Sequence, residues 1–111
     1  MEYLFSYGTL QKPETQLRIF GRTLRGQRDV LRGWKISPVE IKDEAFLGRG
    51  EAKRQNTLIV SETGAETVEG TVFEISAEEL ALADKYEPEN YERFQVLLES
   101  GMKAWIYAAA A

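Results

Sequence analysis

The chain has 111 residues, no cysteine, no histidine and a formal net charge of −4. This length suits one domain with one hydrophobic core, and we expect that domain to span residues 1–111. The missing residue types exclude disulfides, thiolate catalysis, zinc sites built from Cys and His, and a Ser-His-Asp triad. Any acid–base catalysis must therefore use Glu, Asp, Lys or Tyr.

Charge and hydropathy restrict the partners of the chain. The sequence pI is about 4.9, which argues against general binding to nucleic acid. No apolar run approaches the roughly 20 residues of a membrane helix, and the segment Met1-Glu2-Tyr3 lacks the basic start of a signal peptide. We therefore expect a cytoplasmic protein with no nucleic-acid or membrane partner; the sequence leaves its oligomeric state open.

Two charged segments are candidates for a binding surface. Glu40, Asp43 and Glu44 form a short acidic patch without the spacing of a calcium loop, and a solvated surface explains it. A series of arginines could line an anion-binding surface, although a solvated face is the simpler interpretation. Its members are Arg18, Arg22, Arg25, Arg28 and Arg32.

The N-terminal segment predicts a strand, a glycine turn and a helix. Residues 2–7 are rich in aromatic side chains, as strands often are, and Gly8 then interrupts the run. Because glycine has no Cβ, the backbone at Gly8 can adopt a positive φ or approach a ligand closely. Pro13 marks the first turn of a helix and Gly21 its end. The apolar side of this helix carries Leu17 and Phe20.

The middle of the chain has a weaker pattern. Residues 29–41 carry many apolar side chains and predict strand, which Gly33 and Pro38 interrupt. Residues 43–56 show no clean period and predict a loop near the entrance of a site. Residues 57–60 predict a short strand that ends in a polar turn.

The strand predicted over residues 68–75 is apolar on both faces. Val68 and Val72 lie on one face, whereas Phe73 and Ile75 lie on the other. A strand covered on both sides is typical of a barrel wall with helices packed outside it.

A helix and a hairpin follow. Ser76 predicts an N-cap, Glu79 completes a capping box, and Pro88 stops the helix. Residues 92–99 and 103–107 predict two strands joined by a tight turn. Since strands and helices do not alternate regularly, the sequence predicts a mixed α+β domain and not a doubly wound parallel sheet.

Glu87 is the first candidate for chemistry. On helical geometry it shares a face with Leu80 and Ala83, so it points inward if Leu80 faces the core. An inward carboxylate loses water, which raises its pKa toward the range where it can accept and return protons. Asp84 lies close to the same face, and an exposed glutamate at a helix end is the alternative for Glu87.

The segment Tyr7-Gly8-Thr9-Leu10 is the second candidate. By composition it is a strand followed by a glycine turn, and a purely structural turn is one interpretation. Its position favours another, because loops that leave strand ends often build small-molecule sites, with backbone amides directed at anionic groups.

Four segments, in chain order, resemble the γ-glutamylcyclotransferase-like (AIG2-like) family. Leu4–Gln11 resembles the opening Tyr-Gly-Thr/Ser-Leu/Asn motif, and Val68–Ile75 is similar to the glycine-containing middle strand. Ala83–Glu87 followed by Tyr91–Arg93 resembles the Leu-Asp-x-Tyr-Glu and Tyr-x-Arg segment. The closing strand of the family resembles Ala104–Tyr107. Together the four segments span nearly the whole chain.

The resemblance implies a fold, an activity and a site. The family fold is a small mixed β-barrel flanked by helices. Its enzymes are acyltransferases that release 5-oxoproline from small-molecule γ-glutamyl amino acids, γ-glutamyl amines or related substrates, with no cofactor or metal. By resemblance Glu87 is the catalytic residue, and Arg93 would be structural. The substrate-binding residues that the resemblance implies are Tyr7, Gly8, Thr9, Leu10 and Tyr91.

Two departures from the family pattern leave alternatives open. Pro88 stands where the family usually has glycine, and proline fixes φ and removes an amide donor. Residues 43–56 match poorly, and we expect substrate choice to depend on them. The alternatives are a non-catalytic binding domain that keeps the pocket, and an interaction protein with Arg25 and Arg28 on its docking face.

Overall fold

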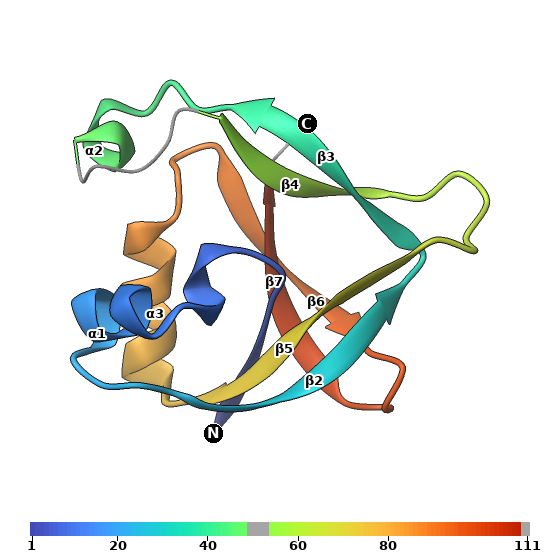
Figure 1. Cartoon of the computed structure of the whole chain (residues 1–111), viewed down its shortest axis with the longest axis horizontal. Helices are drawn as coiled ribbons and strands as arrows, with labels where there is room; N and C mark the ends of the chain where they lie inside the picture. The colour runs from blue at the N-terminus through green and yellow to red at the C-terminus, as the bar shows by residue number, and fades with distance from the viewer. Residues whose placement is uncertain (49–53, 110–111) are drawn as a thin grey trace.

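The computed structural model describes residues 1–48 and 54–109 and has the mixed α+β fold that the sequence predicts (Figure 1). Its strands are β1 (Glu2–Ser6), β2 (Arg25–Arg32), β3 (Trp34–Glu40), β4 (Arg54–Val60), β5 (Thr67–Ile75), β6 (Tyr91–Leu97) and β7 (Lys103–Ala109). Its helices are the 3₁₀-helix η1 (Thr9–Gln11), α1 (Pro13–Phe20), α2 (Glu44–Leu47) and α3 (Ala77–Tyr86). No helix in the described residues has the length and apolar character needed to cross a membrane.

Hydrogen bonds divide the strands into two sheets. The larger sheet has the order β2-β5-β1-β7-β6, and a separate ribbon pairs β3 with β4. Neighbouring strands pair antiparallel except β1 and β7, which run parallel. Within residues 1–48 and 54–109 no ladder joins the two sheets, so the expected β-barrel is not closed. The mixed α+β architecture itself is confirmed.

Polar contacts link the edge strand β2 to the turn between β6 and β7. The buried Asp29 carboxylate accepts hydrogen bonds from the Val30 amide at 2.8 Å, the Ser100 amide at 3.3 Å and the Ser100 hydroxyl at 2.6 Å. Beside it, the Glu99 amide donates to the Val30 carbonyl at 2.9 Å. Arg32 and Glu99 form an ion pair at 2.6 Å. These contacts join one edge strand of the larger sheet, β2, to the turn that follows its other edge strand, β6.

The strand predicted over residues 29–41 is two strands in different sheets. Gly33 separates β2 from β3 and has a φ of 89°, a conformation that favours glycine. Its amide donates to the Glu66 carbonyl at 2.8 Å, and its carbonyl accepts from the Ser61 amide at 2.9 Å. The prediction missed this change of sheet because the apolar pattern continues through Gly33. It also started the first strand too late, since β2 begins at Arg25.

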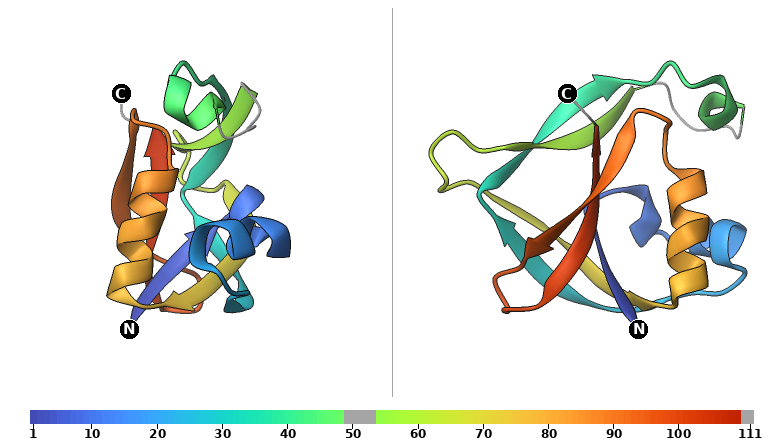
Figure 2. Two further views of the ribbon diagram at one scale, coloured as in Figure 1. Left: turned by 90° about the vertical axis from the view of Figure 1, so that its left-hand side faces the viewer. Right: turned by 180° about the vertical axis from the view of Figure 1, so that it is seen from behind.

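Apolar side chains pack on both faces of the larger sheet. One cluster lies between this sheet and the β3–β4 ribbon and includes Phe5, Leu58 and Val72. The other cluster lies under the helices and includes Phe73 and Leu80; Figure 2 shows α1 and α3 side by side there. Strand β5 contributes to both clusters, as its two apolar faces predict.

Helix α1 has the predicted bounds but buries an unexpected side. It ends at Gly21, whose φ is 73° and whose amide donates to the Leu17 carbonyl at 2.9 Å. The buried residues are Thr15 and Gln16, whereas Leu17 is 53% exposed. The side of the helix that carries Leu17 therefore does not face the core at that residue. Gln16 tolerates burial because its amide group is hydrogen-bonded, to the Leu10 carbonyl at 2.9 Å and from the Leu24 amide at 2.8 Å.

Helix α3 begins with the predicted capping box. The Ser76 hydroxyl accepts from the Glu79 amide at 3.1 Å, and the Glu79 carboxylate accepts from the Ser76 amide at 2.9 Å. Arg22 donates to both oxygens of the same carboxylate, at 2.7 and 2.8 Å. These hydrogen bonds to the charged form lower the pKa of Glu79 to about 2.

The loop predicted over residues 43–56 contains regular structure at both of its ends. Asp43 caps the short helix α2 and accepts a hydrogen bond from the Ala45 amide at 3.0 Å. Its other oxygen accepts from the Glu89 amide at 2.8 Å. Asp43 is thus more than part of a solvated acidic patch. Strand β4 begins at Arg54, and residues 49–53 lie outside the described residues.

Candidate active site

A pocket opens at the C-terminal end of β1. Strands β1 and β7 pair at one register position, Leu4 opposite Trp105, and the pocket lies beyond it. Its cavity volume is about 60 Å³, room for a few water molecules or one small group. The pocket is lined by Leu4, Phe5, Ser6, Tyr7, Gly8, Thr9, Leu10, Phe46, Gln55, Asn56, Tyr86, Glu87, Pro88, Tyr91 and Tyr107.

The loop after β1 forms one wall of the pocket. Gly8 precedes the 3₁₀-helix η1, and no side chain caps this helix start. The first amides of a helix have no partner within it. Here no described residue accepts a hydrogen bond from the amides of Thr9 or Leu10, whereas the Gly8 amide reaches the Ser6 hydroxyl at 3.4 Å. Two backbone donors next to the cavity therefore remain available to an anionic group.

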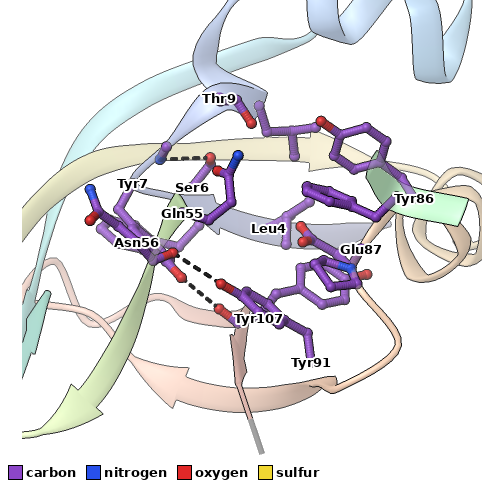
Figure 3. A pocket seen from close by; sticks show the side chains of 15 residues that line it. Leu4, Ser6, Tyr7, Thr9, Gln55, Asn56, Tyr86, Glu87, Tyr91 and Tyr107 are labelled. Carbon is purple, nitrogen blue, oxygen red and sulfur yellow. Dashed lines mark hydrogen bonds between the residues drawn. The ribbon is translucent and has the colours of Figure 1, made fainter. Parts of the chain in front are cut away.

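Glu87 enters the pocket from the end of α3. It is the C-cap of this helix, with φ −66° and ψ 152°, and its amide donates to the Ala83 carbonyl at 3.1 Å. The residue before a proline favours this extended ψ, so Pro88 sets the direction in which the chain leaves the helix. Figure 3 shows the Glu87 carboxylate pointing into the pocket, beside Leu4.

The segment after Glu87 is held by backbone hydrogen bonds. The buried Pro88 contributes a carbonyl that accepts from the Tyr91 amide at 2.9 Å. The next amide, that of Glu89, donates to Asp43. Pro88, which departs from the family pattern, therefore lies in a turn that these two hydrogen bonds hold. With proline at this position, the Glu87 side chain still lines the pocket.

Three tyrosines surround the carboxylate with neutral hydroxyls. Tyr7 donates to the Tyr107 carbonyl at 2.9 Å, and Tyr91 donates to the Asn56 carbonyl at 3.2 Å (Figure 3). Burial, and to a smaller extent the Glu87 charge, raise the pKa of Tyr91 to about 12, while Thr57 opposes the shift. Burial raises the pKa of Tyr7 and Tyr107 still further. All three hydroxyls therefore keep their protons near neutral pH.

The described residues that line the pocket are nearly all uncharged. Among the described lining residues, Glu87 is the only carboxylate, and none is Lys or Arg. The neighbouring carboxylate, Asp84, faces a different set of groups. It accepts from the Tyr107 hydroxyl at 2.6 Å and pairs with Arg93 at 3.5 Å, and Arg93 lies 4.4 Å from the centre of the Trp105 ring. Asp84 thus belongs to a partly exposed polar cluster beside the pocket and does not line the pocket itself.

The structure brings all the predicted site residues to this pocket, namely Glu87, Tyr7, Gly8, Thr9, Leu10 and Tyr91. Sequence reasoning did not single out several other lining residues, including Ser6, Gln55, Asn56 and Tyr107. Tyr107 lies within the segment that resembles the closing strand, which was an available signal. Gln55 and Asn56 lie at the start of β4, in a segment predicted as loop, and only the folding of β4 over the pocket brings them there.

Three arginines of the predicted series have separate partners within the chain. Arg22 binds Glu79 and Arg32 binds Glu99. Arg28 donates to the Gln11 side-chain carbonyl at 3.3 Å. These intramolecular contacts are spread over α3, the β6–β7 turn and η1, so they do not outline one anion-binding surface.

Comparison with known proteins shows which family and which solved structures the chain is similar to. The chain matches the family model of gamma-glutamyl cyclotransferase, AIG2-like, over residues 4–111. No curated protein matches it. The solution structure of At3g28950.1 from Arabidopsis thaliana is similar with a TM-score of 0.68 and 23% identity, covering 98% of this chain and 61% of that one.

A second solution structure, At5g39720.1 from Arabidopsis thaliana, is similar with a TM-score of 0.73 and 22% identity, covering 97% of this chain and 68% of that one. The chain thus spans less than two thirds of At3g28950.1, at 61% of its length. At these identities the two structures show the fold alone, while the family model covers nearly the whole chain. The chain belongs to the AIG2-like gamma-glutamyl cyclotransferase family.

Proposed function

We propose that this protein is a cyclotransferase that releases 5-oxoproline from a γ-glutamyl amino acid or γ-glutamyl amine, with Glu87 as its acid and base. The observation that carries the proposal is the placement of one carboxylate opposite a loop with two available amides, in a pocket otherwise lined by neutral groups. Family membership supports the reaction class.

The reaction needs only proton transfer and a bent substrate. The α-amine of the γ-glutamyl group attacks its own γ-carbonyl carbon, a C–N bond closes the five-membered ring, and the bond to the leaving nitrogen breaks. Glu87 takes a proton from the α-ammonium, which frees the lone pair that attacks, and gives this proton to the leaving nitrogen. The second proton that the α-nitrogen loses on becoming the ring amide passes through the same carboxylate to the released amine, which leaves as an ammonium. The nucleophile is part of the substrate, so a protein without Cys or His can perform this chemistry.

The pocket supplies two further contributions. The Thr9 and Leu10 amides can bind the substrate carboxylate or the oxyanion that develops during attack. Binding that holds the amine and the γ-carbonyl of the substrate together lowers the barrier to ring closure. Glu87 also borders an adjoining open groove, lined by Asp84, Glu92, Arg93 and Trp105 among others, where the leaving group would extend.

The test is a mass-spectrometric assay for 5-oxoproline. The protein is incubated with a panel of γ-glutamyl dipeptides and γ-glutamyl amines, with Glu87→Gln as the matched variant. We expect product from at least one substrate, and loss of that product in Glu87→Gln with the fold retained. Product formation that does not change in Glu87→Gln would remove Glu87 from the mechanism.

A non-catalytic binding domain is the second candidate, and Pro88 is the observation that favours it. A proline after Glu87 removes an amide donor that the usual glycine would provide next to the pocket. This alternative predicts that 5-oxoproline or a γ-glutamyl compound binds in a calorimetric titration while no substrate of the panel is converted.

A further inference from the structure

Gln11 holds the carbonyl of Gly8 through two hydrogen bonds. Its side-chain nitrogen donates to the Gly8 oxygen at 3.2 Å, and its backbone amide donates to the same oxygen at 3.1 Å. Its side-chain oxygen accepts from the Thr71 hydroxyl at 3.0 Å and from Arg28 at 3.3 Å. Every polar atom of the Gln11 side chain is thereby bonded.

The two anchors of Gln11 belong to the central sheet. Arg28 on β2 and Thr71 on β5 are register partners, and Thr71 also stands opposite Ser6 at the end of β1. Gln11 therefore connects the loop after β1 to a part of the sheet that backbone ladders already hold. The sheet holds the Gln11 side chain through Thr71 and Arg28, and the Gln11 side chain holds the loop through the Gly8 carbonyl.

The position of the Gly8 carbonyl determines where the Thr9 amide points. Both groups belong to one planar trans peptide, in which C=O and N–H point in opposite directions. Holding the Gly8 oxygen toward Gln11 therefore directs the Thr9 N–H away from Gln11. The space beside the Gly8 Cα is open, since a Cβ there would have no neighbour within 4 Å. Glycine also offers little resistance to rotation of the plane.

We propose that Gln11 is a positioning residue, which prevents the Gly8–Thr9 peptide from flipping and keeps the Thr9 amide available to the substrate. The part of this inference that concerns catalysis rests on the proposed function. The part that concerns the orientation of the peptide stands on the hydrogen bonds alone. Gln11 itself contacts no reacting atom in this scheme.

The orientation can be measured without substrate. Residual dipolar couplings of the isotope-labelled, ligand-free protein report the direction of the Thr9 N–H bond. We compare the wild-type chain with Gln11→Ala and with Gln11→Glu, which keeps an acceptor for Thr71 and Arg28 but loses the donor to Gly8. The matched control is Gln27→Ala, because Gln27 is an exposed glutamine on β2.

We expect the Thr9 coupling of the wild-type chain and of Gln27→Ala to fit the structure. Both Gln11 variants keep the backbone hydrogen bond to the Gly8 oxygen and lose the one from the side chain. Their Thr9 coupling should therefore be reduced by averaging, while couplings in β1 and β7 stay as they are. A Thr9 coupling that is the same in wild type and in both Gln11 variants would overturn the inference, whatever activity the protein has.

Kinetics then test the catalytic part with the substrate that the assay identifies. A misdirected donor should lower kcat/KM by about tenfold or more in both Gln11 variants, and Gln27→Ala should match wild type. An increase in KM would assign the Thr9 amide to the substrate carboxylate, and a decrease in kcat to the oxyanion. Unchanged kcat/KM in folded Gln11 variants would contradict the catalytic part. Absence of turnover in the wild-type chain would count against the proposed function, and the coupling measurement would still decide the orientation.

Discussion

The cluster around Asp29 and the pocket around Glu87 contain similar polar groups, which stabilise the fold in the first and border a cavity in the second. At Asp29, one buried carboxylate accepts three hydrogen bonds from Val30 and Ser100. In the pocket, one carboxylate faces a cavity, and no described residue accepts from the nearby Thr9 and Leu10 amides. Buried polar groups are normally satisfied within the protein. Backbone amides that border a cavity and have no acceptor among the described residues can instead be satisfied by a ligand, which distinguishes a binding site from a structural cluster.

The largest expected effect is the loss of activity in Glu87→Gln, which tests whether the pocket is a catalytic site. Loss of the acid and base should lower kcat by about 10³-fold, within the range reported for general acid–base groups. Because glutamine has nearly the same shape as glutamate and keeps a side-chain oxygen that accepts hydrogen bonds, the free energy of unfolding should change by only about 1 kcal/mol. Both quantities are measured on the same preparation, by 5-oxoproline formation and by urea unfolding.

The opposite result for Glu87→Gln would give the pocket carboxylate a structural role. A Glu87→Gln protein that turns over substrate normally but loses several kcal/mol of stability would identify Glu87 as a structural carboxylate. The pocket would then resemble the Asp29 cluster, and the comparison would fail.

Gly70→Ala should give the largest loss of stability, because Gly70 lies where the two regions meet. It stands opposite Asp29 on β2, and a Cβ there would lie 2.4 Å from the Ser6 carbonyl and 2.7 Å from the Phe5 ring. Overpacking against backbone should lower the free energy of unfolding by about 3 kcal/mol. The matched variant is Gly8→Ala, where a Cβ meets nothing within 4 Å, and it should change stability little. Urea unfolding of the pair checks the ranking, and equal losses would contradict it.

Asp29→Ala should break the structural cluster and leave the pocket intact. Removing the carboxylate leaves the Ser100 and Val30 donors without their acceptor, which should lower the free energy of unfolding by about 2 kcal/mol. The specific activity of the folded protein should equal that of wild type under conditions where both are fully folded. A drop in specific activity without a drop in stability would show that the two regions are coupled.

The sequence predicts most of the fold where a local pattern has a local cause. The capping box at Ser76, the end of α1 at Gly21 and the two apolar faces of β5 depend on neighbouring residues, and the structure confirms them. The change of sheet at Gly33 and the position of β4 over the pocket depend on partners distant in sequence. Periodicity carries no information about such partners.

The candidate site shows the same division. Residues from two predicted segments meet in the pocket, as the resemblance implies. The contacts of Gln11 with Thr71 and of Asp43 with Glu89 could not be predicted, because each joins residues that are distant in sequence. A polar side chain in sequence gives its capacity to form hydrogen bonds but not its partners.

The smallest expected effect is an alkaline transition that distinguishes a pocket tyrosine from a solvated one. The pKa of Tyr91 is raised from 10.0 to about 12, chiefly by burial, so the folded protein favours the neutral hydroxyl. A raised folded pKa contributes stability that is fully present below pH 10 and is lost as the pH rises toward 12. Because Tyr91 is only partly buried, the contribution should be modest. Ultraviolet absorbance of tyrosinate, followed against pH together with urea unfolding, measures both quantities. Tyr91→Phe should remove one late-titrating tyrosine from the absorbance curve and reduce the loss of stability above pH 10. If the variant instead loses a tyrosine that titrates near pH 10 and keeps the same dependence of stability on pH, the Tyr91 hydroxyl is solvated and does not share the environment of Glu87.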